Sequence, residues 1–297
     1  MQFLGVLILC TAIFLGCGKS TGQSTLSEMS VRDQLRIEID RIKPKLLWCE
    51  GGPADTRANE LTGQANCGLG DSVSIAGFAS LYGHMDFFPY LWSTIDVESG
   101  QPFRFPSARS SGDLVDGYSR DQFLGLALDA FARQNGNLLR LVRDYARGHS
   151  WQLCDPDSDA RCYVTLIMRY AARDALGETL SNSERALDVF TVRKQAEFAP
   201  IGYQLFLNTL NAHLHVLSGH PEYQDAINTA ARRMPSNLFY AALTGQDISD
   251  RLLTCLQKWS APGLHHTFWS EQNTECEERA EGSIGWELVS LGEYILR

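Results

Sequence analysis

"DGYSRDQFLGLALDAF", residues 116 to 131, joins a polar and aromatic first half to a second half that is apolar on nearly every side. Ser119 stands where a helix N-cap residue stands, and Asp121 in the first turn suits the positive end of a helix dipole. Phe123 to Phe131 has the pattern of a helix that is buried all round. The stretch predicts a buried helix with charged residues at its N-terminal end.

The same contrast between buried and half-buried helices recurs along the chain. Ser72 to Tyr82 carries no charge and Ala199 to Leu217 is largely uncharged, so both predict buried helices. Val31 to Leu47 is amphipathic and predicts a surface helix, which Pro44 ends or kinks. Further helices are expected at 137–147, 163–176, 183–192, 222–234, 238–243, 248–259 and 283–296. The fold class expected is all-α.

Buried and amphipathic helices alternate about six times, and two architectures satisfy this alternation. Two concentric layers form an (α/α) toroid of about six helical hairpins, with the buried helices inside. An α-solenoid of helix pairs is the alternative. The sequence has no fixed-period repeat of the kind that a regular solenoid shows, which favours the toroid.

With "SRDQ" opening one inner helix and "SIGWE" opening the last, the pattern resembles the six-hairpin (α/α) toroids of glycosidases and polysaccharide lyases. The resemblance covers most of the chain after its N-terminal segment. It implies that a carbohydrate substrate lies across one end of the barrel, on loops at the ends of the inner helices. It assigns no catalytic residue.

The chain begins MQFLGVLILCTAIFLGCGKS, in which an apolar run too short for a typical membrane span occupies the place of a signal peptide. Phe14 to Cys17 resembles the lipobox of bacterial lipoproteins, and an ordinary secretory signal is the alternative. We expect a signal peptide at 1–16, a lipidated Cys17 with a flexible tether at 17–28, and one domain at 29–297. The expected location is the bacterial cell envelope, with the membrane contacted through the lipid.

The remaining cysteines fit an oxidising compartment. They form three couples close in sequence, and nearest-neighbour pairing is one of fifteen connectivities. Zinc is disfavoured because no CxxC spacing occurs. The predicted disulfide residues are Cys49 with Cys67, Cys154 with Cys162, and Cys255 with Cys276.

Charge and motifs exclude several classes of function. A net charge of −9, from 35 acidic and 26 basic residues, argues against a nucleic-acid partner. The sequence lacks GxSxG, HExxH, Walker A and complete GxGxxG motifs, and no cofactor is expected. His213 and His220 share a helical face but His215 does not, so no metal site is expected. We expect a monomer.

The chemistry expected from the resemblance needs two carboxyl groups, one protonated acid and one ionised base or nucleophile. Asp121 is the first candidate for an acid or base, with Asp116 or Glu281 as its partner. Asp121 serving only as part of a helix cap is the structural alternative. In a lyase, which is the rival enzyme, His266 or Tyr118 would accept the proton while an arginine neutralises a uronate.

The substrate-binding candidates are cationic, aromatic or at a helix start. Arg104 and Arg120 would hold an anionic group, and Trp269 and Trp286 would stack on sugar faces, with core packing as the alternative for each Trp. Asp71, which follows two glycines at a helix start, and Tyr118 complete the set. The expected substrate is an oligo- or polysaccharide. A lipoprotein that binds glycans or a protein without catalysis is the other class considered.

Overall fold

The computed structural model describes residues 29–54, 71–111, 118–154, 162–260, 268 and 285–297. The chain divides into two compact units, Met1–Ser30 and Val31–Arg297. The second unit holds the helices and strands described below.

Helices dominate the second unit, as the sequence predicted. Two short strands, β1 (Trp48–Cys49) and β2 (Gly52–Pro53), pair antiparallel, and η1 (Lys43–Lys45) and η3 (Pro221–Tyr223) are 3₁₀ turns. The α-helices are α1 (Val31–Ile42), α2 (Ser72–Gly83), α3 (Phe88–Ser93), α4 (Pro106–Ser111), α5 (Arg120–Arg133), α6 (Asn137–Gly148), α7 (Leu166–Ala175), α8 (Asn182–Phe198), α9 (Tyr203–Leu217), α10 (Gln224–Arg233), α11 (Leu238–Leu243), α12 (Ser249–Lys258) and α13 (Trp286–Ile295). The all-α class is confirmed for the described residues.

The alternation of buried and half-buried helices follows the sequence pattern. In α2, eleven of the twelve residues are buried, and α5, α9, α11 and α13 are likewise buried on most sides. In α6, by contrast, the buried residues form one stripe of Leu138, Leu139, Val142 and Ala146. The helices α1, α10 and α12 have the same one-sided burial.

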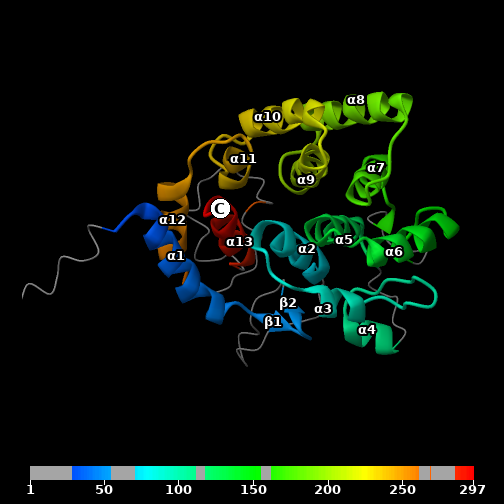
Figure 1. The fold of residues 1–297 in the computed structure, drawn as a ribbon, viewed down its shortest axis with the longest axis horizontal. Coiled ribbons are helices and arrows are strands. Elements are labelled where there is room, and N and C mark those ends of the chain that lie inside the picture. The colour runs from blue at the N-terminus through cyan, green and yellow to red at the C-terminus, as the bar shows by residue number, and fades with distance from the viewer. Residues whose placement is uncertain (1–28, 55–70, 112–117, 155–161, 261–267, 269–284) are drawn as a thin grey trace, which may run out of the picture. The chain divides into compact units, whose positions relative to one another are not determined.

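The buried helices pack against one another, and α13, α2 and α5 lie side by side in the middle of Figure 1. The helix α2 packs against both α5 and α13, α5 packs against α7, and α7 packs against α9. The last helix, α13, also packs against α1, so the two ends of this unit meet. The rings of Phe78, Tyr82, Phe206 and Phe239 are in mutual contact, and they join α2, α9 and α11 at the core.

Two local features of the first helices differ in how well the sequence predicted them. Helix α1 ends at Ile42 and passes into the 3₁₀ turn that contains Pro44, as expected from the missing N–H of proline. The short helices α3 and α4 were not expected, because each has six residues, too few for a hydrophobic period to be read.

The cysteine pairing is confirmed at one position. Cys154 and Cys162 form a disulfide, with Cα atoms 5.7 Å apart. Cys49 and Cys255 each take part in a disulfide bond as well. Their predicted partners Cys67 and Cys276 lie outside the described residues, as do Cys17 and the predicted signal peptide and tether.

Across the described part of the chain, none of the helices combines the length and apolar composition needed to cross a membrane.

Candidate functional site

The first turns of four buried helices meet at one place in the fold. Their polar residues form what we call the N-terminal cluster: Asp71 and Ser74 of the α2 start, Arg120 and Asp121 of α5, Tyr203 of α9 and Glu287 of α13. Because these helices begin at the same place, the positive ends of their dipoles all lie near the cluster. Such a place suits negatively charged groups.

Asp121 is the central residue of the cluster. Its side chain is buried, with 3% of the residue exposed, and Ser74 Oγ donates a hydrogen bond to Asp121 Oδ2 at 3.2 Å. Ser119 is the N-cap residue of α5, and its backbone N–H donates to Gln122 Oε1 at 3.1 Å. This cap fixes the first turn and therefore the position of Asp121.

The surroundings of Asp121 favour its protonated form. Burial, the like charge of Asp71 and a hydrogen bond between the two side chains together raise the pKa of Asp121 to about 6, with burial the largest cause. Two carboxyl groups can form such a hydrogen bond only if one of them carries a proton. With a pKa of about 6, Asp121 can both donate and accept a proton near neutral pH.

An apolar cavity adjoins Asp121 and accounts for part of its desolvation. The cavity is lined by Ile75, Phe78, Leu124, Leu128, Phe206, Leu207 and Leu210, together with Ser74, Asp121, Gly125 and Glu287. Its volume of about 10 Å³ holds roughly one water molecule. Two carboxyl groups, those of Asp121 and Glu287, therefore line one small and mostly apolar space.

Arg120 and Tyr203 lie on the more exposed side of the cluster. The Arg120 guanidinium lies 5.6 Å from the centre of the Tyr203 ring, in cation–π contact. Burial raises the pKa of the Tyr203 hydroxyl well above its ordinary value, and the nearby Asp121 adds to this effect. Tyr203 is therefore a hydrogen-bond donor across the physiological pH range.

The structure brings together three of the predicted site residues, Asp71, Arg120 and Asp121. Arg104 lies half-buried in the bend before α4. Tyr118 is buried, and its hydroxyl donates to the Gln122 carbonyl oxygen at 3.3 Å. The predicted Asp116, His266, Trp269 and Glu281 lie outside the described residues.

Trp286 is packed inside the protein, and a different Trp offers an exposed ring beside it. Trp286 is 1% exposed, and its Nε1 donates to the Leu47 carbonyl oxygen at 3.1 Å. Trp48 is 54% exposed, and its ring centre lies 5.0 Å from that of Trp286 in an edge-to-face arrangement and 5.6 Å from that of Phe87. An exposed indole held in place by two rings is suited to stacking on a sugar.

Sequence reasoning did not select Ser74, Tyr203, Glu287 or Trp48. Ser74 had a usable signal, because it is a polar residue in the first turn of a helix that is otherwise buried. Glu287 had one too, as a carboxylate in the first turn of the apolar C-terminal run. Trp48 and Tyr203 had none, since only tertiary contacts place them near the other residues.

The three histidines considered for a metal site are in different environments. His213 Nδ1 is 2.7 Å from the Tyr82 hydroxyl, while His215 and His220 belong to an ionic network at the other end of α9. Within the described ranges, no group of three His, Cys, Asp or Glu side chains has a geometry that would hold a metal ion.

Comparisons of the chain with protein-family models, with curated proteins and with solved structures find no match.

Proposed function

We propose that the second unit is an (α/α) toroid whose inner layer is α2, α5, α7, α9, α11 and α13. The outer layer is then α1, the pair α3 and α4, α6, α8, α10 and α12, so that outer and inner helices alternate strictly along the chain. The burial of the inner set and the contact between α13 and both α1 and α2 support this arrangement. The shared position of four inner-helix starts supports it too.

On this fold, the N-terminal cluster is proposed to hydrolyse glycosidic bonds. The observation that carries the proposal is the position of Asp121, which is buried over an apolar cavity and next to Asp71, so that its pKa is raised to about 6. A carboxyl group whose pKa is raised toward neutrality is suited to protonating a glycosidic oxygen.

Four residues of the cluster are proposed to take part in this chemistry. Asp121 donates its proton to the leaving-group oxygen, and Asp71 stabilises the protonated form before that step. The second carboxyl is proposed to be Asp116 or Glu281, the two partners that the sequence predicts. Arg120 and Tyr203 bind the sugar hydroxyl or acidic groups.

The substrate is proposed to approach from the side of Asp71, Arg120 and Tyr203. These residues are half-buried, whereas the cavity on the other side of Asp121 holds only about one water molecule. A sugar ring is far larger than that cavity. Trp48 would then provide a stacking surface next to Trp286 and Glu287.

A polysaccharide lyase is less well supported. It needs an arginine to neutralise a uronate and a base to remove the C5 proton, and Arg120 with Tyr203 has the right residue types. However, a Tyr whose pKa is raised by burial is a poor base.

The test is a screen of neutral and uronate-containing polysaccharides, with wild type compared with Asp121→Asn and Asp129→Asn. Asp129 is the matched control, because it is equally buried (3%) on the same helix but pairs with Arg133 at 2.8 Å. We expect reducing ends to be released by wild type and Asp129→Asn, and release to fall at least about a hundredfold in Asp121→Asn.

Three outcomes of that screen would contradict the proposal. Absorbance from unsaturated uronates, instead of reducing-end release, would identify a lyase. Equal release by Asp121→Asn and wild type would remove Asp121 from the mechanism. Glycan binding without cleavage in all three proteins would favour a binding protein.

The chain is further proposed to be exported and attached to the bacterial envelope through a lipid on Cys17. The disulfide between Cys154 and Cys162 supports export, because such bonds persist in oxidising compartments. Labelling with radioactive palmitate tests the anchor. Wild type is expected to carry the label, and Cys17→Ser is expected to lose it and to leave the membrane fraction.

A further inference from the structure

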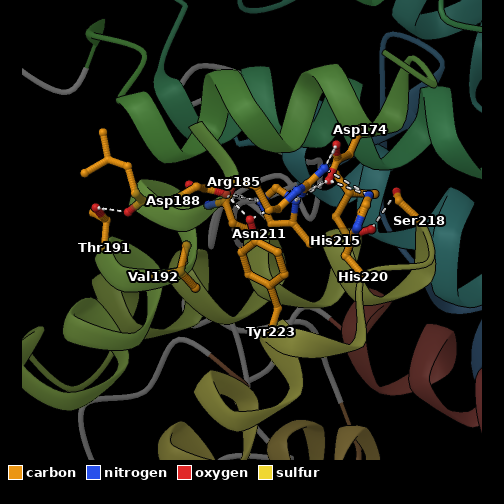
Figure 2. A network of polar contacts seen from close by, with 12 residues as sticks. Asp174, Arg185, Asp188, Thr191, Val192, Asn211, His215, Ser218, His220 and Tyr223 are labelled. Carbon is orange, nitrogen blue, oxygen red and sulfur yellow. Dashed lines mark hydrogen bonds and ion pairs between the residues drawn. The ribbon is translucent and has the colours of Figure 1, made fainter. Parts of the chain in front are cut away.

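An ionic network lies at the opposite end of α9 from the N-terminal cluster, and Figure 2 shows how its side chains meet. His215 of α9 is fully buried. Its Nδ1 lies 2.6 Å from Asp174 Oδ2 of α7, and its Nε2 lies 3.0 Å from Asp188 Oδ2 of α8. Both ring nitrogens therefore face a carboxylate oxygen.

Two further side chains complete the network. Arg185 of α8 binds Asp174 in a bidentate manner, through hydrogen bonds of 2.5 and 2.7 Å. The Tyr223 hydroxyl of η3 donates to Asp188 Oδ2 at 2.5 Å, and the Tyr223 ring is stacked on the His215 ring with centres 4.0 Å apart. The network thus joins α7, α8, α9 and η3.

The arrangement of the charged groups favours a doubly protonated His215. Asp188 Oδ2 faces both the Tyr223 hydroxyl and His215 Nε2, as an ionised carboxylate would. Asp188 Oδ1 and His215 Nε2 are both buried without an aligned hydrogen-bond partner among the described residues, so the 3.0 Å contact between His215 Nε2 and Asp188 Oδ2 is an ion pair. With Asp174 and Asp188 ionised and Arg185 positive, the network is neutral only if His215 carries two protons.

Loss of one proton from His215 would be costly here. One ring nitrogen would then present a lone pair to a carboxylate oxygen, and the buried group would carry a net negative charge. Burial alone lowers the pKa of His215, but the interactions with Asp174 and Asp188 outweigh it and raise this pKa above its ordinary value. Burial alone raises the pKa of Asp174, and its bonds to His215 and Arg185 outweigh that and lower it.

A polar cavity gives this buried network access to solvent. The cavity has a volume of about 430 Å³. Asp174, Arg185, His220 and Glu222 form part of its wall. His220 Nε2 lies 2.9 Å from Arg185 Nη2, and His220 Nδ1 lies 3.6 Å from Glu222 Oε1. Protons can therefore reach the network from the cavity.

We propose that the His215 network is a pH-dependent latch, in which doubly protonated His215 holds α7, α8, α9 and η3 together and its deprotonation loosens the wall of the polar cavity. The groups that face His215 are Asp174 from α7, Arg185 and Asp188 from α8, and Tyr223 from η3, with His220 and Glu222 beyond Arg185. From α5 and α10, which also pack against α9, the described residues show no charged contact with His215. The latch does not depend on the proposed hydrolase activity.

The latch is tested by hydrogen exchange of the backbone amides of α8 and α9, measured from pH 6 to 10 and corrected for the intrinsic pH dependence of exchange. In wild type, protection of the C-terminal half of α9 and of the first turns of α8 is expected to fall as the pH rises through the His215 pKa. A ¹⁵N-detected titration of the His215 ring is expected to have the same midpoint.

Two variants separate a latch from a purely structural contact. Asp188→Asn keeps the size of the side chain and an oxygen for Tyr223, but removes one of the two charges that hold the His215 proton. We expect the midpoint of both curves to fall by about one pH unit or more. His149→Gln, which alters an exposed histidine of the α6 end, is expected to leave both curves unchanged.

The proposal is overturned if wild-type protection in α8 and α9 does not change between pH 6 and 10. It is also overturned if Asp188→Asn lowers protection by the same factor at every pH, because that result describes a contact without proton dependence. The ring titration tests the latch independently of stability, since a His215 that is neutral at pH 6 in the wild-type protein contradicts it.

Discussion

Gly77 of α2 and Gly125 of α5 lie directly against each other. A Cβ atom at Gly77 would be 2.0 Å from the Gly125 carbonyl oxygen, and a Cβ atom at Gly125 would be 2.5 Å from the Val73 carbonyl oxygen. The two helices therefore touch backbone to backbone, as only glycine permits. This close approach is also what brings Ser74 within hydrogen-bond distance of Asp121 one turn away.

Gly125→Ala is expected to lower the free energy of unfolding by about 1–3 kcal/mol, because the added methyl group meets backbone atoms that cannot rotate away. Alanine normally stabilises a helix relative to glycine. A loss of stability in Gly125→Ala would therefore come from the contact between α2 and α5. Urea unfolding followed by circular dichroism gives the value. Gly148→Ala is the control, since a Cβ atom there meets nothing within 4 Å, and it is expected to be neutral or stabilising. A stable Gly125→Ala protein would mean that α2 and α5 are farther apart.

The sequence predicted the helices well because hydrophobic period and burial are linked. The amphipathic pattern at 137–147 became α6, and the uncharged pattern at 72–82 became α2. The contact between Gly77 and Gly125 depends on tertiary packing, which the sequence pattern of either helix alone does not indicate.

The ionisation of Asp121 should destabilise the folded protein. A carboxyl whose pKa rises from about 4 in the unfolded chain to about 6 in the folded protein imposes no cost below pH 4. The cost develops as the pH rises from 4 to 6 and is complete above 6, at about 2–3 kcal/mol. Asp121→Asn removes it, so the variant is expected to be more stable than wild type at pH 8 and nearly equal to it at pH 4. Thermal unfolding at both values checks this, and a difference that is the same at pH 4 and pH 8 would contradict a raised pKa.

The candidate site was partly predictable. Asp71, Arg120 and Asp121 stand at helix starts, where short polar segments meet apolar runs, and this signal is local. Trp48 and Trp286 are far apart in sequence, and nothing local indicates that one is buried by the other. Trp286, one of the two indoles predicted to stack on sugars, is therefore inside the protein. Its exposed neighbour Trp48 was not predicted.

Removal of the disulfide between Cys154 and Cys162 should lower stability moderately. The bond closes a short loop, with a sequence separation of 8, and the chain-entropy relation gives about 2–3 kcal/mol for such a loop. The loop is also held by the hydrogen bond from Leu153 N to the Cys162 carbonyl oxygen at 3.1 Å, so the fold itself is expected to survive. Unfolding of a Cys154→Ala, Cys162→Ala double variant gives the value. If wild type and variant unfold together in the absence of reductant, the bond does not constrain the unfolded chain.

Trp48 is expected to contribute to carbohydrate binding without contributing much to stability. Its ring is half exposed yet held by Trp286 and Phe87, so little conformational entropy is lost when a sugar stacks on it. Trp48→Ala should weaken the binding of cello-, xylo- or chito-oligosaccharides about five- to tenfold, as measured by calorimetry. Trp92→Ala is the matched control, because Trp92 is 43% exposed but is in contact with Phe88 instead of the Trp286 pair, and its affinity should equal that of wild type. Equal weakening by both substitutions would indicate nonspecific contact with exposed aromatic rings, and no weakening by Trp48→Ala would place the sugar elsewhere on the cluster.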